Sequence, residues 1–183
     1  MMTLPTFSNM DINHFPERLH ALLETNQSKI KELLNSASAY TWDNLMGPLD
    51  DMEDELERIW SPLSHLHAVT NSTALRKCYK ACLPLLSAYE AAIGHNQVLF
   101  SAIKSLDKST LNPTQCKIID DTIRDFKLSG VALSTEKKQR FEAISARLSE
   151  LSNQFETHIL DAVNDYQLHI TNEARLAGLP EHA

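Results

Sequence analysis

Residues 134–166 read STEKKQRFEAISARLSELSNQFETHILDAVNDY, and this stretch decides the fold expected for the chain. Its apolar residues recur at alternating steps of three and four, whereas Glu, Ser, Asn and Gln fill most positions between them. This spacing predicts a long amphipathic helix whose buried seam is formed by Phe141, Ile144, Leu148, Leu151 and Phe155. A seam of this length needs an apolar partner.

The segment just before this helix offers such a partner. Residues 112–128 carry apolar side chains at compatible spacing, and Gly130 stands between the two segments as a helix C-cap and turn. The sequence therefore predicts a long antiparallel helical hairpin over about 113–129 and 134–166. The apolar residues of its first helix are Ile118, Ile119, Ile123 and Phe126.

The composition of the whole chain favours helix over sheet. The 183 residues include only four glycines and scarcely any alternating runs of Val, Ile and Thr, while Ala, Leu, Glu, Lys and Ser are abundant. The predicted class is all-α, a multi-helix bundle, and the length fits a single domain over 1–183.

The charge balance and the N-terminus bear on possible partners and location. There are 17 basic and 24 acidic residues, so the formal charge of −7 repels nucleic acid and anionic membranes. The cluster Lys137, Lys138 and Arg140 is too short to reverse this and is interpreted as a solvated helix face. No export signal and no stretch of about 18 apolar residues is recognisable, so a cytoplasmic protein is expected.

Local signals place the other elements along the chain. Residues 1–12 are expected to form an extended arm over the body, and 167–183 an extended segment followed by the start of a further, missing unit. Gly47-Pro48 is expected to end or bend a short helix capped by Thr41, and Ser61-Pro62 to break or kink the next one. Further helices are expected from about Asn13 to Ala37, from 73 to 93 with a bend at Pro84, from 98 to 106, and from Asn112-Pro113 onward.

Three groups of polar residues could in principle bind a metal. The first is an acidic run, which no glycine-bearing loop folds around a cation and which therefore favours a solvated face. The second is one Glu-x-x-His pair, an element that di-metal bundles use twice. The third is two thiols four residues apart, better interpreted as small buried side chains. The residues are Asp50, Asp51, Glu53, Asp54, Glu55 and Glu57; Glu17 and His20; and Cys78 and Cys82.

Neither the remaining pair of histidines nor any known sequence motif indicates a catalytic or metal site. His65 and His67 are two residues apart and cannot chelate together on a helix, so one of them packed near Trp60 is the preferred interpretation. The chain contains no His-Glu-x-x-His, P-loop, Gly-x-Ser-x-Gly or Gly-x-Gly-x-x-Gly motif. We therefore predict no catalytic, cofactor-binding or metal-binding residue in this chain.

Several stretches resemble the N-terminal part of bacterial zinc metallopeptidases of the thimet oligopeptidase family. They occur in this order over nearly the whole chain, which makes the combination specific. They are YTWDNL (40–45) with PL (48–49), SPLSHL (61–66), LPLLS (83–87), RDF (124–126) with LSG (128–130), RLSELSNQF (147–155) and LAGLP (176–180).

The resemblance implies a parent enzyme that degrades short peptides with one zinc ion held by a His-Glu-x-x-His helix and a distant Glu. In that family the motif lies hundreds of residues beyond the position of Ala183, so no site residue transfers, and this chain alone is expected to be inactive. Its helices are expected to form one wall of a deep channel that admits short peptides.

If the chain is part of a larger enzyme, its surface should show where the rest of the enzyme packs. The chain should expose an apolar patch that packs on the missing catalytic lobe, or hide it in a dimer. One alternative is a stand-alone helical interaction module without catalytic activity. Another is a helical bundle with its own metal site at the Glu17/His20 or Cys78/Cys82 pair.

Overall fold

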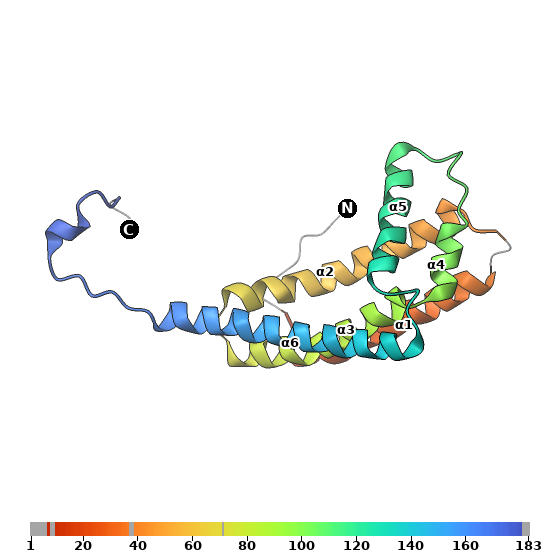
Figure 1. The fold of residues 1–183 in the computed structure, drawn as a ribbon. Helices are drawn as coiled ribbons and strands as arrows, with labels where there is room; N and C mark the ends of the chain where they lie inside the picture. The colour runs from red at the N-terminus through yellow and green to blue at the C-terminus, as the bar shows by residue number, and fades with distance from the viewer. Residues whose placement is uncertain (1–6, 8–9, 37–38, 71, 181–183) are drawn as a thin grey trace.

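The structure is a computed structural model that describes residues 7, 10–36, 39–70 and 72–180. Within these residues the chain is helical and contains no β-strand, which confirms the all-α class (Figure 1). None of its helices combines the length and the hydrophobicity needed to cross a membrane. The elements are α1 (Phe15–Ser36), the π-helical turn η2 (Trp42–Met46), α2 (Gly47–Val69), α3 (Thr73–Gly94), α4 (Gln97–Lys104), α5 (Pro113–Leu128), α6 (Thr135–Asp165) and the 3-10 turn η3 (Glu173–Leu176).

Short polar motifs fix several helix starts. Thr41 and Asn112 each form a capping box. In each, the cap side chain accepts a hydrogen bond from the backbone N–H of the residue three positions later, and the side chain of that residue accepts one from the backbone N–H of the cap. Pro113 follows Asn112 at the first helical position, where its missing N–H costs no hydrogen bond. Ser72 caps α3 in the same general way. These starts depend on local sequence alone.

The two predicted proline interruptions have different outcomes. The short helix η2 ends at Met46, and α2 begins directly at Gly47 with Pro48 in its first turn. At Ser61-Pro62, where a break or a kink was predicted, the helix does not break, since α2 continues to Val69 with Pro62 inside it. Pro62 is buried beside the fully buried Leu63, so tertiary packing offsets the local penalty of the proline.

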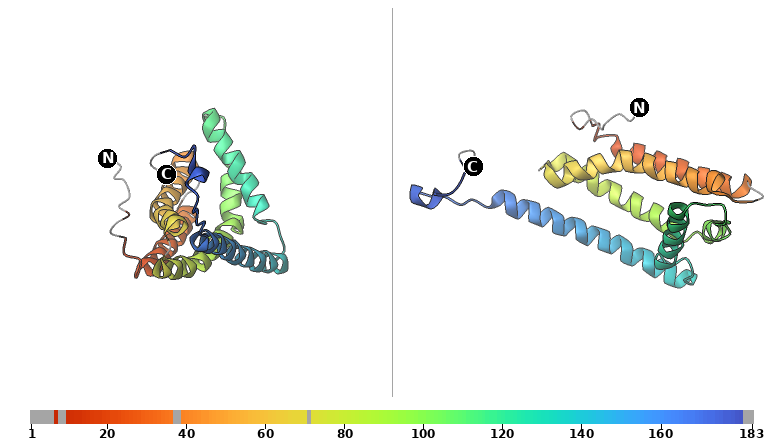
Figure 2. Two further views of the ribbon diagram at one scale, coloured as in Figure 1. Left: turned by 90° about the vertical axis from the view of Figure 1, so that its left-hand side faces the viewer. Right: turned by 90° about the horizontal axis from the view of Figure 1, so that it is seen from above.

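Helices α1, α2 and α3 pack on one another along their length, and α6 lies along α3 (Figures 1 and 2). Helices α4 and α5 sit at one end of this body. Two apolar clusters form the core: one joins α1, α2 and α3, and the other lies where α4 and α5 meet α1 and α2. The first contains Leu19, Leu23, Leu56, Leu63 and Cys82, and the second Ile30, Leu45, Leu99, Ile103, Ile119 and Phe126.

The predicted antiparallel hairpin of α5 and α6 is not what the structure shows. Helix α5 rises steeply beside the start of α6, whereas α6 packs extensively along α3 (Figures 1 and 2). Ile119 and Phe126 of α5 are buried against α4 and α1 rather than against the α6 seam. The amphipathic pattern indicated that both helices need partners, but it could not say which ones.

The turn at Gly130 redirects the chain between these helices. Gly130 adopts a φ of 85°, a left-handed conformation that favours glycine, and an added Cβ would lie 2.6 Å from the Leu133 side chain. The next residue, Val131, is buried in the core and its N–H donates to the Phe126 carbonyl. The predicted C-cap and turn are therefore present, although the helices that they connect are not antiparallel.

The two ends of the chain differ in how they contact the body. Of the arm predicted over 1–12, most residues lie outside those that the structure describes, but Met10 and Ile12 pack against the α1–α3 cluster. Residues 166–180 leave the end of α6 and extend away from the helical body (Figure 1). The backbone is extended at Tyr166 and at Asn172, and the short 3-10 turn Glu173–Leu176 follows.

Candidate functional site

Three hollows of about 490, 470 and 370 Å³ follow one another along the body and are here together called the trough. The first lies mainly between α2, α3, α4 and α5, the second between α2, α3 and α6, and the third between α2 and α6. The first two share Glu90 and Ser129 as lining residues. The third begins one helical turn farther along α6, at Glu156 after Ser152. The view from above in Figure 2 shows α3 between α2 and α6.

Three stacked rings form the α2 side of the trough. The ring centroid of Tyr79 lies 4.9 Å from that of Trp60 and 3.9 Å from that of His67, with nearly parallel planes in both pairs. His67 is 4% exposed and faces the hollow that Ile159 and Val163 line from α6. Burial lowers the pKa of His67, so its ring is held in the neutral form.

The charges that line the trough are negative. Burial against neighbouring groups raises the pKa of Glu53, and repulsion from Glu57 and Asp50 adds to the effect. Burial, followed by repulsion from Glu53, likewise raises the pKa of Glu90. Among the described residues that line these three hollows there is no Lys or Arg. The trough is therefore an apolar channel bordered by carboxylates that repel one another.

Helix α6 presents an uncovered apolar row, here called the α6 stripe. The six side chains are 44–67% exposed and recur at steps of three and four. Leu148, Ile159 and Val163 also line the trough, so the stripe and the trough form one continuous apolar surface. The expected exposed apolar patch is thus present. The stripe consists of Ile144, Leu148, Leu151, Phe155, Ile159 and Val163.

Helix α6 touches α3 through a different face. Ser145, Ser149, Asn153 and Thr157, spaced by four, are less exposed than the apolar residues beside them. Small polar side chains allow two helices to approach closely. Phe141, the first residue of the predicted seam, belongs to this less exposed row and its ring centroid lies 5.6 Å from that of His95. From Ile144 onward, the predicted seam and the less exposed row are two adjacent faces of the helix.

Polar contacts hold α6 against α3 at both ends. Near the end of α6, Asp161 accepts from the Arg76 guanidinium, with Nη1 to Oδ2 at 3.2 Å. Near its start, Glu142 lies 3.1 Å from Nδ1 of His95, and the Lys138 ammonium donates to the His95 carbonyl at 3.0 Å. These contacts fix the width of the trough.

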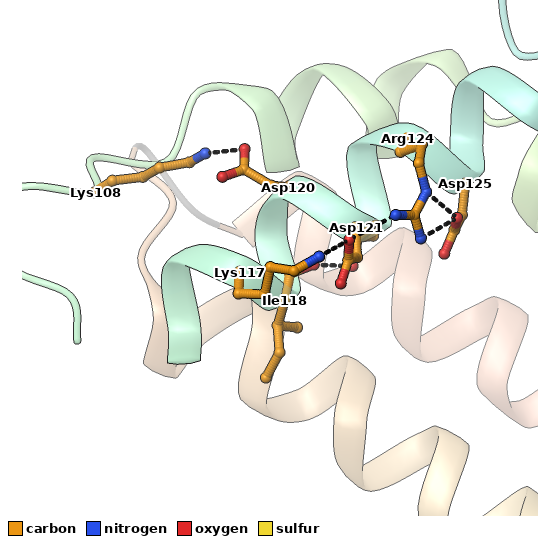
Figure 3. A network of polar contacts seen from close by, with 8 residues as sticks. Lys108, Lys117, Ile118, Asp120, Asp121, Arg124 and Asp125 are labelled. Carbon is orange, nitrogen blue, oxygen red and sulfur yellow. Dashed lines mark hydrogen bonds and ion pairs between the residues drawn. The ribbon is translucent and has the colours of Figure 1, made fainter. Parts of the chain in front are cut away.

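The charges on α5 are balanced, in contrast to those of the trough. Figure 3 shows a row of ion pairs in which three cations meet three carboxylates, while Ile118 points away from the row. Ile118 is one of the residues lining the hollow between α2 and α5. The pairs are Lys108–Asp120, Lys117–Asp121, Arg124–Asp121 and Arg124–Asp125.

The structure does not bring the sequence candidates together as a metal site. His20 lies 3.5 Å from Glu24 rather than pairing with Glu17. Cys78 and Cys82 are buried, and burial raises the pKa of Cys82 to about 12, so the thiol stays protonated and is a poor metal ligand. Among the described residues, no three His, Cys, Asp or Glu side chains converge. The described residues therefore do not fit zinc.

The acidic run and the two histidines singled out in the sequence contact ordinary neighbours in the fold. In the acidic run, Asp54 pairs with Arg58 at 2.7 Å and Glu55 lies 3.8 Å from Lys29. Of the two histidines, His67 packs near Trp60 through Tyr79, as the sequence suggested for one of them. Sequence reasoning missed Glu90 and Tyr79 as trough residues, because both were treated only as parts of α3. Tyr79 and Glu90 are four or seven residues from Leu83 and Leu86, and this spacing could have indicated that all four share one face of the helix.

Comparison with known proteins shows which family the chain resembles. Residues 19–138 match the model of the neurolysin/thimet oligopeptidase N-terminal domain. The chain is 43% identical to oligopeptidase A of Haemophilus influenzae and 41% identical to oligopeptidase A of Escherichia coli, each match covering 98% of this chain and 27% of the relative. It is 29% identical to the organellar oligopeptidase A of Arabidopsis thaliana, over 98% of this chain and 23% of that relative.

The match is confined to one part of these relatives. The chain spans about a quarter of their length, and the family model that it matches is an N-terminal domain. The predicted resemblance is confirmed, and the region that would carry the catalytic motif is absent from this chain. By its sequence and its all-helical fold, the chain belongs to the thimet oligopeptidase family and corresponds to the N-terminal region of its oligopeptidase A members.

Proposed function

We propose that this chain forms the helical channel wall of a cytoplasmic, oligopeptidase A-like zinc metallopeptidase that degrades short peptides. The observation that carries the proposal is the coverage: 98% of the chain aligns at 43% identity with a peptidase of which it spans only 27%. A region that matches so completely, yet lacks the catalytic part, serves the enzyme as structure. On this proposal zinc is held by residues outside the chain.

The exposed surface supports the same role. The α6 stripe leaves six large apolar side chains uncovered, which is unusual for a protein that has no partner. The trough beside it is open to solvent and apolar, as expected for a surface that meets another part of a larger enzyme. A rigid helical wall would limit access to short, flexible peptides.

Peptide cleavage tests this function directly. The chain is assayed alone and together with the remaining part of the Haemophilus influenzae relative, produced as a separate polypeptide, on a fluorogenic short peptide. We expect no cleavage by the chain alone and chelator-sensitive cleavage by the mixture. The H. influenzae part supplied with its own N-terminal region is the positive control.

Two outcomes would contradict the proposal. Chelator-sensitive cleavage by the purified 183-residue chain would show that it carries a catalytic site of its own. Failure of the mixture to cleave, while the positive control is active, would favour the stand-alone interaction module. The channel is tested with a second substrate, a folded protein of similar composition to the peptide. The assembled enzyme should leave this protein intact.

A further inference from the structure

We propose that the α6 stripe and the trough together bind one amphipathic α-helix with basic residues along its edges, contributed by the part of the enzyme that lies outside this chain. The inference rests on the proposed function, because it takes the occupant from the longer polypeptide. It goes further by stating the secondary structure, the charge and the place of that element.

The shape of the surface selects a helix. The α6 stripe runs from residue 144 to residue 163, and its steps of three and four place its side chains in a ridge about 28 Å long that winds gradually around the helix toward the third hollow. The ridge borders a groove whose floor at the second hollow is α3 and whose opposite wall carries Trp60 and His67. Ridges of one helix packing into the groove between two others is the ordinary geometry of helical bundles.

Backbone hydrogen bonding excludes an extended segment. A strand needs unpaired N–H and C=O groups on its partner, and the described elements around the trough are helices that bond internally. An extended peptide lying on Leu148, Phe155 and Ile159 would leave its own polar backbone facing apolar side chains. A helix satisfies its backbone internally and presents only side chains to the stripe.

The charges select basic residues on that helix. Glu53 and Glu90 border the hollows next to α2 and α3, and Glu156 borders the third hollow from α6. The described lining of the three hollows offers them no Lys or Arg. Lys or Arg at the edges of the incoming helix would relieve the repulsion between these carboxylates as water leaves the trough.

One buried group identifies the point of closest contact. His67 is 4% exposed, stacks on the Tyr79 ring, and lines the third hollow opposite Ile159 and Val163. A neutral imidazole there can donate one hydrogen bond and accept another. The incoming helix is therefore expected to place a hydroxyl or amide side chain opposite His67.

Binding measurements with matched variants test the proposal. The probe is the remaining part of the H. influenzae relative, and its affinity for the chain is measured by calorimetry. Phe155→Glu places a carboxylate in the α6 stripe, and Ala143→Glu places one on another exposed face of the same helix. We expect Phe155→Glu to weaken binding at least about tenfold and Ala143→Glu to change it less than about twofold.

The charge and the helical form are tested separately. The double variant Glu53→Gln, Glu90→Gln should reduce the salt dependence of binding, whereas Glu24→Gln with Glu136→Gln should not. Hydrogen exchange locates the segment of the probe that becomes protected. A synthetic peptide of that segment should gain helical circular dichroism on binding, and its sequence should carry Lys or Arg beside an apolar face.

The outcomes separate this inference from the proposed function. Equal affinities for the Phe155→Glu and Ala143→Glu variants, or a bound peptide that stays extended, would overturn the inference even if the mixture cleaves peptides. A complex that forms through the stripe but cleaves nothing would support the inference and contradict the function. A dimer of the chain that Phe155→Glu abolishes would assign the stripe to a second copy and overturn the inference.

Discussion

Asn26 is a polar residue in the middle of the apolar face of α1. It is fully buried, its Nδ2 donates to the Met52 carbonyl at 3.5 Å, and its side chain interacts with the Tyr89 hydroxyl. In the structure it links α1 to α2 and α3, which explains a polar residue at a core position.

Replacing Asn26 should therefore be costly. Asn26→Ala removes the hydrogen bond to the buried Met52 carbonyl, and we expect a loss of about 1–3 kcal/mol in the free energy of unfolding. Urea unfolding followed by circular dichroism measures the change. Asn35→Ala, at an exposed position later in α1, is the control and should change the free energy of unfolding by less than about 0.5 kcal/mol.

His67 should make stability depend on pH. Burial lowers the pKa of His67 in the folded state, so below the ordinary value of about 6.5 the unfolded chain takes up a proton more readily than the folded one. The stability that the neutral ring contributes is fully present above that value. It is lost as the pH falls through the lowered pKa of the folded state.

The variant His67→Phe keeps the stacking on Tyr79 but cannot be protonated. We expect its free energy of unfolding to fall less than that of the natural chain between pH 7.5 and pH 5, as read from urea titrations at several pH values. The exposed His20, changed to Gln, provides the comparison. An unchanged slope in His67→Phe would show that other groups set the pH dependence.

At the scale of elements, α6 shows how one helix can carry two distinct faces. Its small polar row packs on α3, while its larger apolar residues remain exposed. Hydrophobic periodicity identifies the apolar row and assigns it to the core by default. That default was wrong here, because the cover for this row is not provided by the described part of the chain.

The ion pair between Arg76 and Asp161 should control how firmly the last turns of α6 are held. Both groups are partly exposed and screened by solvent, so we expect Asp161→Asn to weaken the attachment only modestly. Amide hydrogens in the last two turns of α6 should then exchange up to about five times faster, since local opening becomes easier. Hydrogen exchange with mass spectrometry reads this locally.

Glu150→Gln is the matched control for that variant. It removes one carboxylate from α6 and one ion pair, with Arg147, that stays within the helix. The last two turns of α6 should exchange at an unchanged rate in this variant. Equal acceleration in both variants would show that net charge, rather than the contact with α3, governs the opening.

At the scale of the whole molecule, the end of the chain contributes little to the stability of the body. Residues 166–180 extend away from the helices, and Tyr166, Leu168 and Leu179 are 58–71% exposed (Figure 1). A chain ending at Asp165 should therefore unfold within about 0.5 kcal/mol of the full chain. A larger loss would mean that this segment folds back onto the body in solution.

The sequence by itself determined the features that depend on near neighbours. The helix starts at Thr41, Ser72 and Asn112 follow from caps within one turn, and the turn at Gly130 follows from a conformation that glycine adopts most readily. The all-α class follows from the composition. The family followed from short stretches kept in order along the chain, which needs no knowledge of contacts.

Only the tertiary structure decided which faces meet. It placed α6 on α3 instead of α5, carried α2 through Pro62, and joined Glu90, Trp60 and Tyr79 into one trough. The physical reason is that periodicity shows how strongly a face avoids water, whereas the choice of partner depends on shape and on the energy of the entire bundle. For the α6 stripe, that choice extends beyond the residues of this chain.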